Sequence, residues 1–308
     1  MVLAGPTAVG KTAVAVELCH RLGAEVVGAD SVQVYRGLDI GSAKPTPAEM
    51  ALAPHHLVDV AEPDEAMSAA RWADLAEAAI AEIDARGRRV LVAGGTGLYI
   101  KALIFGLAPA PAVDRDLRAG LQKDWDRLGG AALHARLADL DPASAARLHP
   151  ADRQRIIRAL EVCLQTGRPF SESQRSHGFA RPRYPHLFLG LERPRAELNA
   201  RIDQRCRDMW RGGLIKEVRG LLAQGLSPEA PALASLGYRQ ALAFIRGEMD
   251  EATALAEMVS RTKAYAKRQF TWFRAVPGIN WFSPTAIDDP AGLAARAGEF
   301  WSLKDMAS

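Results

Sequence analysis

The most telling stretch of this sequence is Gly5-Pro6-Thr7-Ala8-Val9-Gly10-Lys11-Thr12, which fits the phosphate-binding pattern G-x-x-x-x-G-K-[ST]. An apolar run at 1–4 precedes it and predicts a strand, and the apolar spacing after it predicts a helix over 11–22. In that context backbone N–H groups and the helix N-terminus face an anion. Lys11 would add a positive charge, and the hydroxyl of Thr12 would ligate Mg²⁺. We therefore expect residues 5–12 to bind a polyphosphate or a diphosphate.

Short apolar runs alternate with helical patterns over the first 110 residues. The patterns predict strands at 1–4, 25–30, 55–60 and 90–93, and helices at 11–22 and 68–85. Such alternation is typical of a parallel sheet that helices cover on both faces. Further strands are expected at 185–191 and 278–282. The expected fold class is α/β, with a P-loop NTPase-like parallel sheet flanked by helices.

An all-helical pattern from Val113 to about Arg183 interrupts this alternation just after Pro109-Ala110-Pro111. It predicts an insertion domain at 113–183 within a catalytic core made of 1–112 and 184–308. The core then continues with helices at about 195–211, 213–224, 237–246 and 251–275.

One helix of the insertion has clear ends, because Asp152 can cap it and Gly167 can stop it. Its apolar spacing predicts a buried face formed by Ile156, Leu160, Cys163 and Leu164. The same spacing leaves Gln154, Arg155 and Arg158 for another surface.

Two strand ends carry polar side chains that bear on the chemistry. A P-loop kinase or ATPase has an acidic residue after a second buried strand, but 90–93 is followed by Gly94-Gly95-Thr96-Gly97. The acid instead follows 25–29, as Asp30. Because ligands gather at the carboxyl ends of parallel strands, we expect Asp30 and Thr96 to face the phosphate loop. Asp30 could hold a metal or accept a proton there, and ATP hydrolysis is disfavoured.

The composition is that of a globular protein, with 48% hydrophobic and 24% charged residues. The three cysteines are far apart, which favours a reducing cytoplasm and no structural metal. We expect no signal peptide before a phosphate loop at residue 5, and no membrane span in 90–113, which glycines and prolines interrupt.

The net charge is only +3, but basic residues are concentrated in two segments. Seven arginines fall between 153 and 183 against two acids, and 260–274 has five basic residues and no acid. Aromatic neighbours in the second segment favour a nucleic-acid surface, while solvated helix faces are an equally good interpretation of the charge alone.

The block Asp30-Ser31-Val32-Gln33-Val34-Tyr35-Arg36-Gly37-Leu38-Asp39-Ile40-Gly41-Ser42-Ala43-Lys44-Pro45 indicates a family. With it, nearly the whole chain resembles the bacterial tRNA dimethylallyltransferases, the tRNA isopentenyltransferase family. The other motifs that carry the resemblance are the phosphate loop, Gly94-Gly95-Thr96-Gly97-Leu98-Tyr99, Arg153 to Glu161, Leu236-Gly237-Tyr238-Arg239-Gln240, and Tyr265 to Phe273.

The resemblance implies transfer of a dimethylallyl group from dimethylallyl diphosphate to N6 of the adenosine at position 37 of tRNA, just 3′ of the anticodon. The phosphate loop then holds a leaving group, which explains the missing kinase signature. By this resemblance Asp30 takes the proton of the incoming amine, and Thr7 lies beside the reacting centre. Lys11, Mg²⁺ on Thr12, Arg205 and Thr96 neutralise the departing diphosphate. Without the resemblance, Arg205 is better interpreted as a surface ion pair with Asp203 or Asp208.

The resemblance also implies a tRNA-binding set that reaches the anticodon stem-loop. Its members are Asp30, Ser31, Val32, Gln33, Thr96, Arg118, Gln154, Arg155, Ile156, Ile157, Arg158, Ser235, Leu236, Gly237, Tyr238 and Arg239. Gln33 would contact a neighbouring base edge, although without the motif a solvated loop amide is the plainer interpretation. Tyr238 and Arg239 would stack or contact phosphate, although a helix start with a half-buried tyrosine is the plainer interpretation there. We expect a cytoplasmic monomer with no membrane association.

Three other functions stay open at this point. An isopentenyltransferase acting on free AMP, ADP or ATP would share the phosphate loop and Asp30, but would have no use for an arginine-bearing insertion. A small-molecule P-loop kinase predicts ATP turnover. A non-enzymatic RNA-binding module would keep the loop only as a turn, which Lys11, Asp30 and Thr96 together disfavour.

Overall fold

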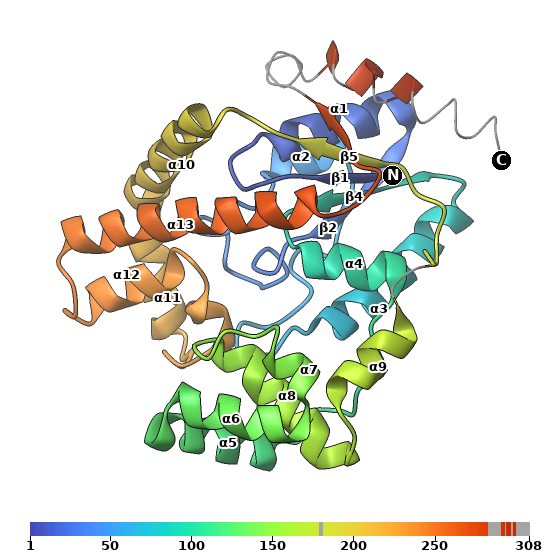
Figure 1. Ribbon diagram of the computed structural model, residues 1–308. Helices are drawn as coiled ribbons and strands as arrows, with labels where there is room; N and C mark the ends of the chain where they lie inside the picture. The colour runs from blue at the N-terminus through green and yellow to red at the C-terminus, as the bar shows by residue number, and fades with distance from the viewer. Residues whose placement is uncertain (179–180, 283–290, 293, 297, 300–308) are drawn as a thin grey trace. The chain divides into compact units, whose positions relative to one another are not determined.

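The computed structural model describes residues 1–178, 181–282, 291–292, 294–296 and 298–299 (Figure 1). Its strands form one parallel sheet in the order β3-β2-β4-β1-β5-β6. The strands are β1 (Val2–Ala4), β2 (Ala24–Ala29), β3 (His55–His56), β4 (Arg89–Gly94), β5 (Phe188–Leu191) and β6 (Asn280–Phe282). A parallel sheet flanked by helices confirms the predicted α/β class.

Helices fill most of the chain between the strands. Before β5 they are α1 (Lys11–Leu22), α2 (Pro47–Leu52), α3 (Ala69–Ala85), α4 (Gly97–Phe105), α5 (Arg115–Leu128), α6 (Gly130–Leu140), α7 (Pro142–Ala145), α8 (Arg153–Thr166) and α9 (Phe170–His177). After β5 they are α10 (Arg195–Met209), the π-helical turn η1 (Trp210–Leu214), α11 (Ile215–Ala223), the 3₁₀ turn η2 (Pro231–Ala234), α12 (Tyr238–Ile245) and α13 (Glu251–Arg274).

Local sequence sets several of these boundaries. The predicted helix over 11–22 is confirmed, and it begins after Gly10, whose φ of 108° is a left-handed conformation that suits glycine. In α8 the Asp152 carboxylate accepts the N–H of Arg155, and Gly167 ends the helix with a φ of 65°. Both predicted ends of that helix are therefore confirmed.

The predicted strand over 55–60 is wrong beyond His56. Leu57 and Asp59 have φ values of 63° and 56°, so the chain turns away from the sheet edge. Asp59 is instead ion-paired with Lys44, and the N–H of Val60 bonds Val34 O at 2.8 Å. A contact with a distant loop has replaced the continuation of the strand.

Two other elements differ from expectation. The predicted helices at 195–211 and 213–224 run into each other through η1, where Gly213 has a φ of 112°. The short helix α2 was not expected, although Thr46 forms a capping box with Glu49 at its start.

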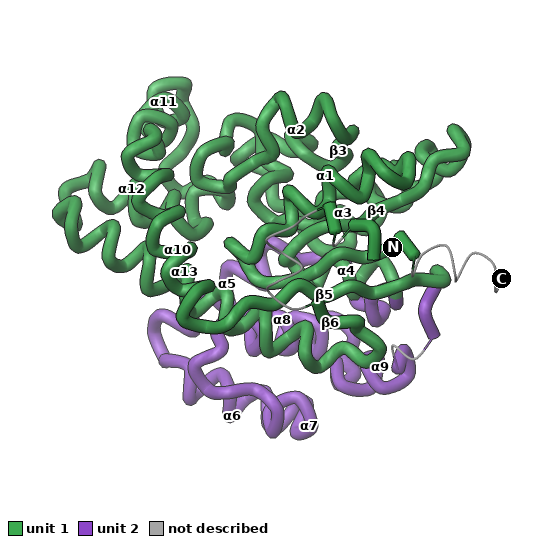
Figure 2. The backbone as a smooth tube through the Cα atoms, turned by 90° about the horizontal axis from the view of Figure 1, so that it is seen from above, with its two compact units in different colours: residues 1–104, 184–308 green, residues 105–183 purple. Residues whose placement is uncertain are grey.

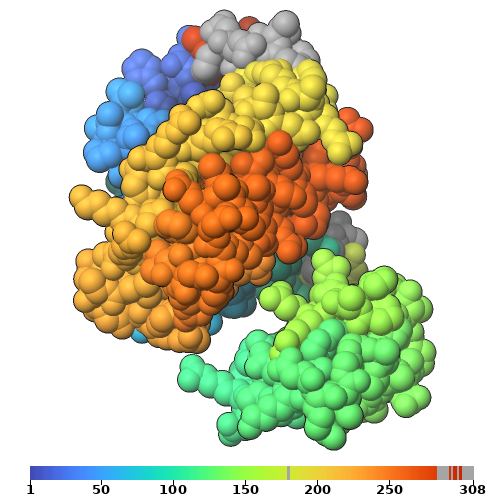
Figure 3. All heavy atoms as spheres, turned by 90° about the vertical axis from the view of Figure 1, so that its left-hand side faces the viewer, coloured from blue at the N-terminus to red at the C-terminus, as the bar shows by residue number. Residues whose placement is uncertain are grey.

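The chain divides into two compact units (Figure 2): residues 1–104 with 184–308, and residues 105–183. The sequence placed this boundary at 113 instead of 105. In the first unit, α1 and α3 pack on β2 and β4 over a core that contains Leu3, Leu18 and Leu91. In the same unit α10 lies against α13 (Figure 3), and α13 also packs on α12.

The second unit is a small helical bundle with its own core. Leu121, Leu133, Leu137, Ala145, Ile156, Ile157, Ala159, Leu160 and Cys163 form that core. Leu164, expected on the buried face of α8, is 38% exposed, and Ile157 is buried in its place. In the described part of the chain, no helix combines the length and the apolar character that crossing a bilayer requires.

Candidate active site

The strand order brings three loops together at the carboxyl ends of neighbouring strands. The phosphate loop follows β1, Gly94 to Gly97 follows β4, and Asp30 follows β2. The N–H of Thr96 donates to Ala29 O at 3.0 Å, and the N–H of Ser31 donates to Thr96 Oγ1 at 3.1 Å. The Thr96 hydroxyl thus fixes the start of the loop that carries Asp30.

An open cavity of about 620 Å³ lies over the phosphate loop. Thr7, Ala8, Gly10, Lys11 and Thr12 line it from the loop itself. The cavity wall also carries Asp30, Gln33, Arg201, Arg205, Tyr265 and Gln269. Residues from both sequence segments of the first unit, 1–104 and 184–308, therefore surround the predicted diphosphate site.

The backbone of the phosphate loop holds the Lys11 side chain in place. Its Nζ donates to Gly5 O at 3.0 Å and to Pro6 O at 2.9 Å. Burial lowers the pKa of Lys11 to about 8, although the nearby Asp30 carboxylate opposes that shift. An anion in the cavity would supply the negative charge that a buried ammonium lacks.

Two arginines from later in the chain hold the backbone of the phosphate loop. Arg201 Nε donates to Ala8 O at 2.9 Å, and Arg193 Nε donates to Val9 O at 3.2 Å. Ala8 has a φ of 63°, a left-handed conformation that is rare outside glycine. The two arginines lock this turn, and nothing in the sequence pattern had indicated them.

The Asp30 carboxylate is oriented by its own loop. Oδ1 accepts the N–H of Val32 at 2.8 Å and that of Gln33 at 3.3 Å. Among the described residues none donates a hydrogen bond to Oδ2, and Asp30 lines the cavity. One oxygen is therefore structural, and the other is available to accept a proton or to bind a cation.

Arg205 projects into the cavity without an ion pair among the described residues. The two carboxylates that could have paired with it are engaged elsewhere, Asp203 with Arg207 at 2.8 Å and Asp208 with Gln204 at 2.8 Å. Burial lowers the pKa of the Arg205 guanidinium, while Asp30 raises it. The surface ion pair that the residues alone favoured is absent, and the guanidinium is free to bind an anion.

A second, more enclosed cavity of about 280 Å³ adjoins the first. Its own wall combines apolar and polar side chains, among them Val32, Ile202, Met258, Ser235, Leu236 and Arg268. The two cavities share Thr7, Ala8, Asp30, Arg205, Met209 and Tyr265. Burial, followed by the charge of Asp30, raises the pKa of the shared Tyr265 to about 12, so its phenol stays protonated.

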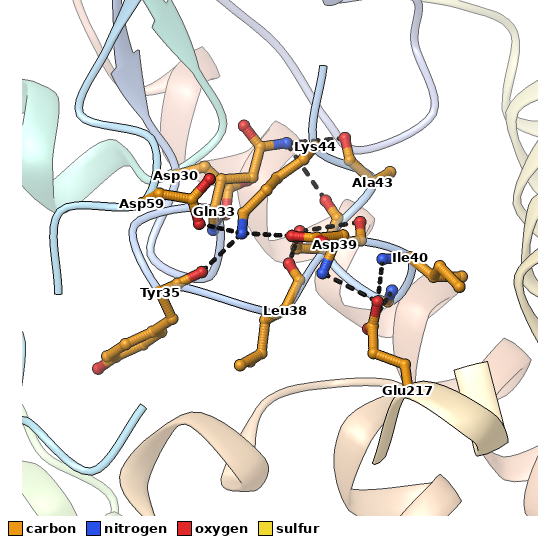
Figure 4. A network of polar contacts seen from close by, with 12 residues as sticks. Asp30, Gln33, Tyr35, Leu38, Asp39, Ile40, Ala43, Lys44, Asp59 and Glu217 are labelled. Carbon is orange, nitrogen blue, oxygen red and sulfur yellow. Dashed lines mark hydrogen bonds and ion pairs between the residues drawn. The ribbon is translucent and has the colours of Figure 1, made fainter. Parts of the chain in front are cut away.

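The block from Asp30 to Pro45 folds as a loop fixed at two points (Figure 4). Lys44 Nζ donates to Tyr35 O at 2.7 Å and to Asp39 Oδ1 at 2.6 Å, and it also pairs with Asp59. On the other side the Glu217 carboxylate accepts the backbone N–H groups of Asp39, Ile40 and Gly41 at 2.7–3.4 Å. Lys44 therefore ties the loop to the segment after β3, and Glu217 ties it to α11.

Gln33 is less free than the sequence suggested. Its Nε2 donates to Ser42 O at 3.2 Å and to Ala43 O at 3.0 Å, within the same loop (Figure 4). Because those carbonyls can only accept, the amide orientation is fixed. Only Oε1 is left to face the cavity, so a bidentate contact with a base edge is excluded in this conformation.

Three residues expected to contact tRNA are buried in a core. Tyr238 is 0% exposed, and its hydroxyl donates to Glu217 Oε1 at 2.7 Å. The prediction that its ring stacks on a base or contacts phosphate is wrong for this conformation. Ile156 and Ile157 lie in the core of the helical unit, so their side chains cannot contact tRNA either. The family resemblance alone had placed these three residues against tRNA, whereas the apolar spacing of α8 had correctly placed Ile156 on the buried face.

Arg118 and Arg158 form ion pairs with a buried carboxylate. Glu161 is 0% exposed, and it accepts hydrogen bonds from Arg118 Nε at 3.2 Å and from the N–H of Asp114 at 3.0 Å. It also forms an ion pair with Arg158 Nη1 at 3.2 Å. A carboxylate buried among apolar side chains needs such partners. These two arginines are therefore committed to the fold of the unit, whatever else they touch.

Other residues that were predicted to contact tRNA are accessible. The Arg155 side chain is 76% exposed, and Gln154 and Arg155 line a cavity of about 360 Å³ in the helical unit. In the first unit, Ser235 and Leu236 line the second cavity, and Arg239 is exposed, with an ion-pair contact of 3.8 Å to Glu257.

Sequence reasoning missed four residues that build the site: Arg193, Arg201, Glu217 and Gln269. The backbone groups that they hold in the site lie 174 to 262 positions away along the chain. Gln269 had been quoted only as part of a motif. No periodic or spacing pattern identifies a side chain whose partner is a distant peptide group.

A family model described as IPP transferase matches residues 33–276. The chain belongs to the IPP transferase family. It is 51% identical over 296 residues to a tRNA dimethylallyltransferase of Anaeromyxobacter dehalogenans (strain 2CP-C), which covers 96% of this chain and 98% of that protein. A relative of the same name from Geobacter sulfurreducens is 48% identical over 299 residues, covering 96% of each chain.

Solved structures of family members have the same fold. The full-length tRNA isopentenylpyrophosphate transferase of Bacillus halodurans matches with a TM-score of 0.70 and 36% identity, over 99% of this chain and 98% of that one. A eukaryotic dimethylallyltransferase acting on tRNA matches with a TM-score of 0.81 and 26% identity, over 98% of this chain and 79% of that one. The family resemblance noted in the sequence is therefore confirmed over nearly the whole length of this chain.

Proposed function

We propose that this protein transfers the dimethylallyl group of dimethylallyl diphosphate to N6 of adenosine 37 in tRNA, releasing diphosphate. The observation that carries the proposal is the wall shared by two cavities, where Asp30, Thr7 and Arg205 face both. One cavity contains most of the phosphate loop, and the other is smaller and more enclosed. A donor and a purine that entered from the two sides would meet at Asp30.

The chemistry needs a base and a site for the leaving group. The lone pair of an adenine amine is delocalised into the ring, so the amine attacks carbon weakly unless a base removes its proton as the new bond forms. Asp30 Oδ2 is free for that role, because only Oδ1 is hydrogen-bonded by the loop. The N6–C bond forms, the allylic C–O bond breaks, and the electron pair leaves with the diphosphate.

Charge on the departing diphosphate is neutralised by the other side of the site. Lys11, Arg205 and Arg201 all line the first cavity, and Arg205 forms no ion pair with a carboxylate of the described residues. A planar guanidinium suits a diphosphate because it donates two parallel hydrogen bonds. Thr7 lies at the shared wall, beside the place where the C–O bond would break. Thr96 contributes by positioning Ser31 through its hydroxyl.

Mg²⁺ is the cation that fits these residues. The Thr12 hydroxyl lines the first cavity and is a hard oxygen ligand. Mg²⁺ needs few protein ligands, because it takes its other ligands from phosphate oxygens and water. Bound on Thr12, the ion would supply electrostatic stabilisation to the diphosphate.

We further propose that residues 113–183 contact the anticodon stem, with Gln154 and Arg155 as the exposed members of the predicted set. In the core, the backbone from Ser31 to Gln33, Ser235, Leu236 and Arg239 would lie near the extruded adenosine. Extrusion is needed because a stacked base cannot reach an enclosed carboxylate. We expect the enzyme to act as a monomer in the cytoplasm.

The decisive experiment offers labelled dimethylallyl diphosphate to two acceptors, an unmodified tRNA with adenosine at position 37 and free AMP. Label in the tRNA alone is the expected result. The matched control is the same tRNA with guanosine at position 37, which has no N6 amine and should remain unlabelled. Transfer to AMP and not to tRNA would overturn the proposed acceptor, and ATP turnover without prenyl transfer would overturn the reaction.

A further inference from the structure

Gln269 connects the two loops that surround the reacting atoms. Its Oε1 accepts the N–H of Thr7 at 2.9 Å, and its Nε2 donates to Gly95 O at 2.8 Å. Thr7 belongs to the phosphate loop after β1, and Gly95 immediately precedes Thr96 after β4. One side chain of α13 therefore spans both loops with the two ends of a single amide.

The amide is held firmly enough to transmit position. Gln269 is 7% exposed, and both partners are backbone groups of short loops between fixed strands and helices. The donor N–H of Thr7 and the acceptor C=O of Gly95 also fix which end of the amide is which, so the side chain has one orientation.

The absence of a side chain at Gly95 also indicates that the Gln269 amide is held in one position. A Cβ placed on Gly95 would lie 2.2 Å from Gln269 Nε2, while its next contact would be Gln269 Cδ at 3.4 Å. The absence of a side chain at this position therefore makes room for the amide itself. Gly95 does not have the left-handed φ that would require glycine on backbone grounds.

Resting on the proposed function, we propose that Gln269 is a positioning residue for prenyl transfer. It sets the spacing between Thr7, at the wall shared by the cavities, and the Thr96 hydroxyl, which holds Ser31 and hence the loop of Asp30. Leaving group and base are thus placed relative to each other by one amide. A misplacement of about 1 Å at a reacting centre lowers rates about 100-fold.

The variant Gln269→Met tests this directly, because methionine fills a similar volume without donating or accepting these bonds. At saturating dimethylallyl diphosphate and tRNA we expect kcat to fall about 10- to 100-fold, with KM for tRNA within about twofold. A purely structural role would lower the melting temperature and leave kcat per folded molecule unchanged, and that result would overturn the proposal.

Gly95→Ala places a methyl group against the Gln269 amide and displaces it without changing Gln269 itself. This variant keeps the proposal testable if Gln269→Met fails to fold. The double variant should be no slower than the slower single variant, because both changes remove one connection. Multiplication of the two losses would show independent effects and refute the proposal. Gly220→Ala, where an added Cβ meets nothing within 4 Å, is the matched glycine control.

A second control separates a lost buried amide from lost positioning. Gln240 is 1% exposed, and its Oε1 accepts the N–H of Gly237 at 3.0 Å, but it lines neither cavity. Gln240→Met should lower stability with little effect on kcat. If the wild-type protein transferred no prenyl group, the proposed function and this inference would both fall. An active wild type with unchanged kcat in Gln269→Met would refute the inference alone.

Discussion

Substitution of Asp30 by asparagine isolates the proposed proton-accepting role of this residue. The side-chain oxygen of the introduced asparagine can still accept the N–H groups of Val32 and Gln33, which lie 2.8 and 3.3 Å from the native oxygen. The turn is therefore retained, while the oxygen that faces the cavity becomes an amide nitrogen with no affinity for a proton. We expect Asp30→Asn to fold normally and to bind tRNA normally.

The expected loss of rate follows from the role of the carboxylate. A positioned general base contributes about 10² to 10⁴ in rate, or about 3 to 5 kcal/mol of transition-state stabilisation. Asp30→Ala should lose the same catalytic contribution and, in addition, about 1 to 2 kcal/mol of stability, because the N–H groups of Val32 and Gln33 lose their acceptor.

Single-turnover transfer of labelled prenyl to tRNA measures the chemical step, and filter binding measures the dissociation constant for tRNA. Thermal unfolding of both variants provides the stability control. A rate for Asp30→Asn within about threefold of wild type would refute general-base catalysis by this carboxylate, given the expected range. Equal losses of rate and tRNA affinity would move Asp30 from chemistry to binding.

Four further predictions concern charge and burial. Arg155→Ala should reduce the salt slope of tRNA binding, that is, the dependence of the logarithm of affinity on the logarithm of salt concentration, by about one without changing stability. Filter binding across a salt series measures this slope. Arg158→Ala should lower the free energy of unfolding of the helical unit by about 1 to 3 kcal/mol, which thermal melts measure. The pKa of Lys11 is about 8, so its charge is lost above that pH and the affinity for inorganic diphosphate should fall by up to tenfold per pH unit. Calorimetric titration measures this affinity, and Lys11→Met should remove the pH dependence. Tyr238→Phe removes a hydroxyl bonded to Glu217, and it should lower stability by about 1 kcal/mol while the salt slope of tRNA binding stays unchanged.

Each of these predictions has a result that would contradict it. An unchanged salt slope in Arg155→Ala would take α8 off the RNA. Full stability of Arg158→Ala would mean that the buried carboxylate does not need this partner. A pH-dependent affinity that survives in Lys11→Met would assign the titration to another group. A lowered salt slope in Tyr238→Phe would restore this residue to the RNA surface.

The sequence alone determined the features that depend on near neighbours. The helix over 11–22, the Asp152 cap and the Gly167 stop follow from residues within about four positions, because capping and left-handed glycine are local properties. The parallel sheet followed from alternating patterns, and the position of Asp30 followed from the rule that ligand-binding loops meet at the carboxyl ends of strands.

Tertiary structure decided which polar side chains face a ligand and which are used by the fold. Arg158 and Arg205 look alike in the sequence, but one is bonded to a buried carboxylate and the other faces a cavity without a partner among the described residues. Tyr238 is closed off by Glu217, 21 positions away, and Gln269 reaches Thr7 across 262 positions. A buried polar group must find a partner wherever the folded chain supplies one, and that requirement leaves no periodic trace in the sequence.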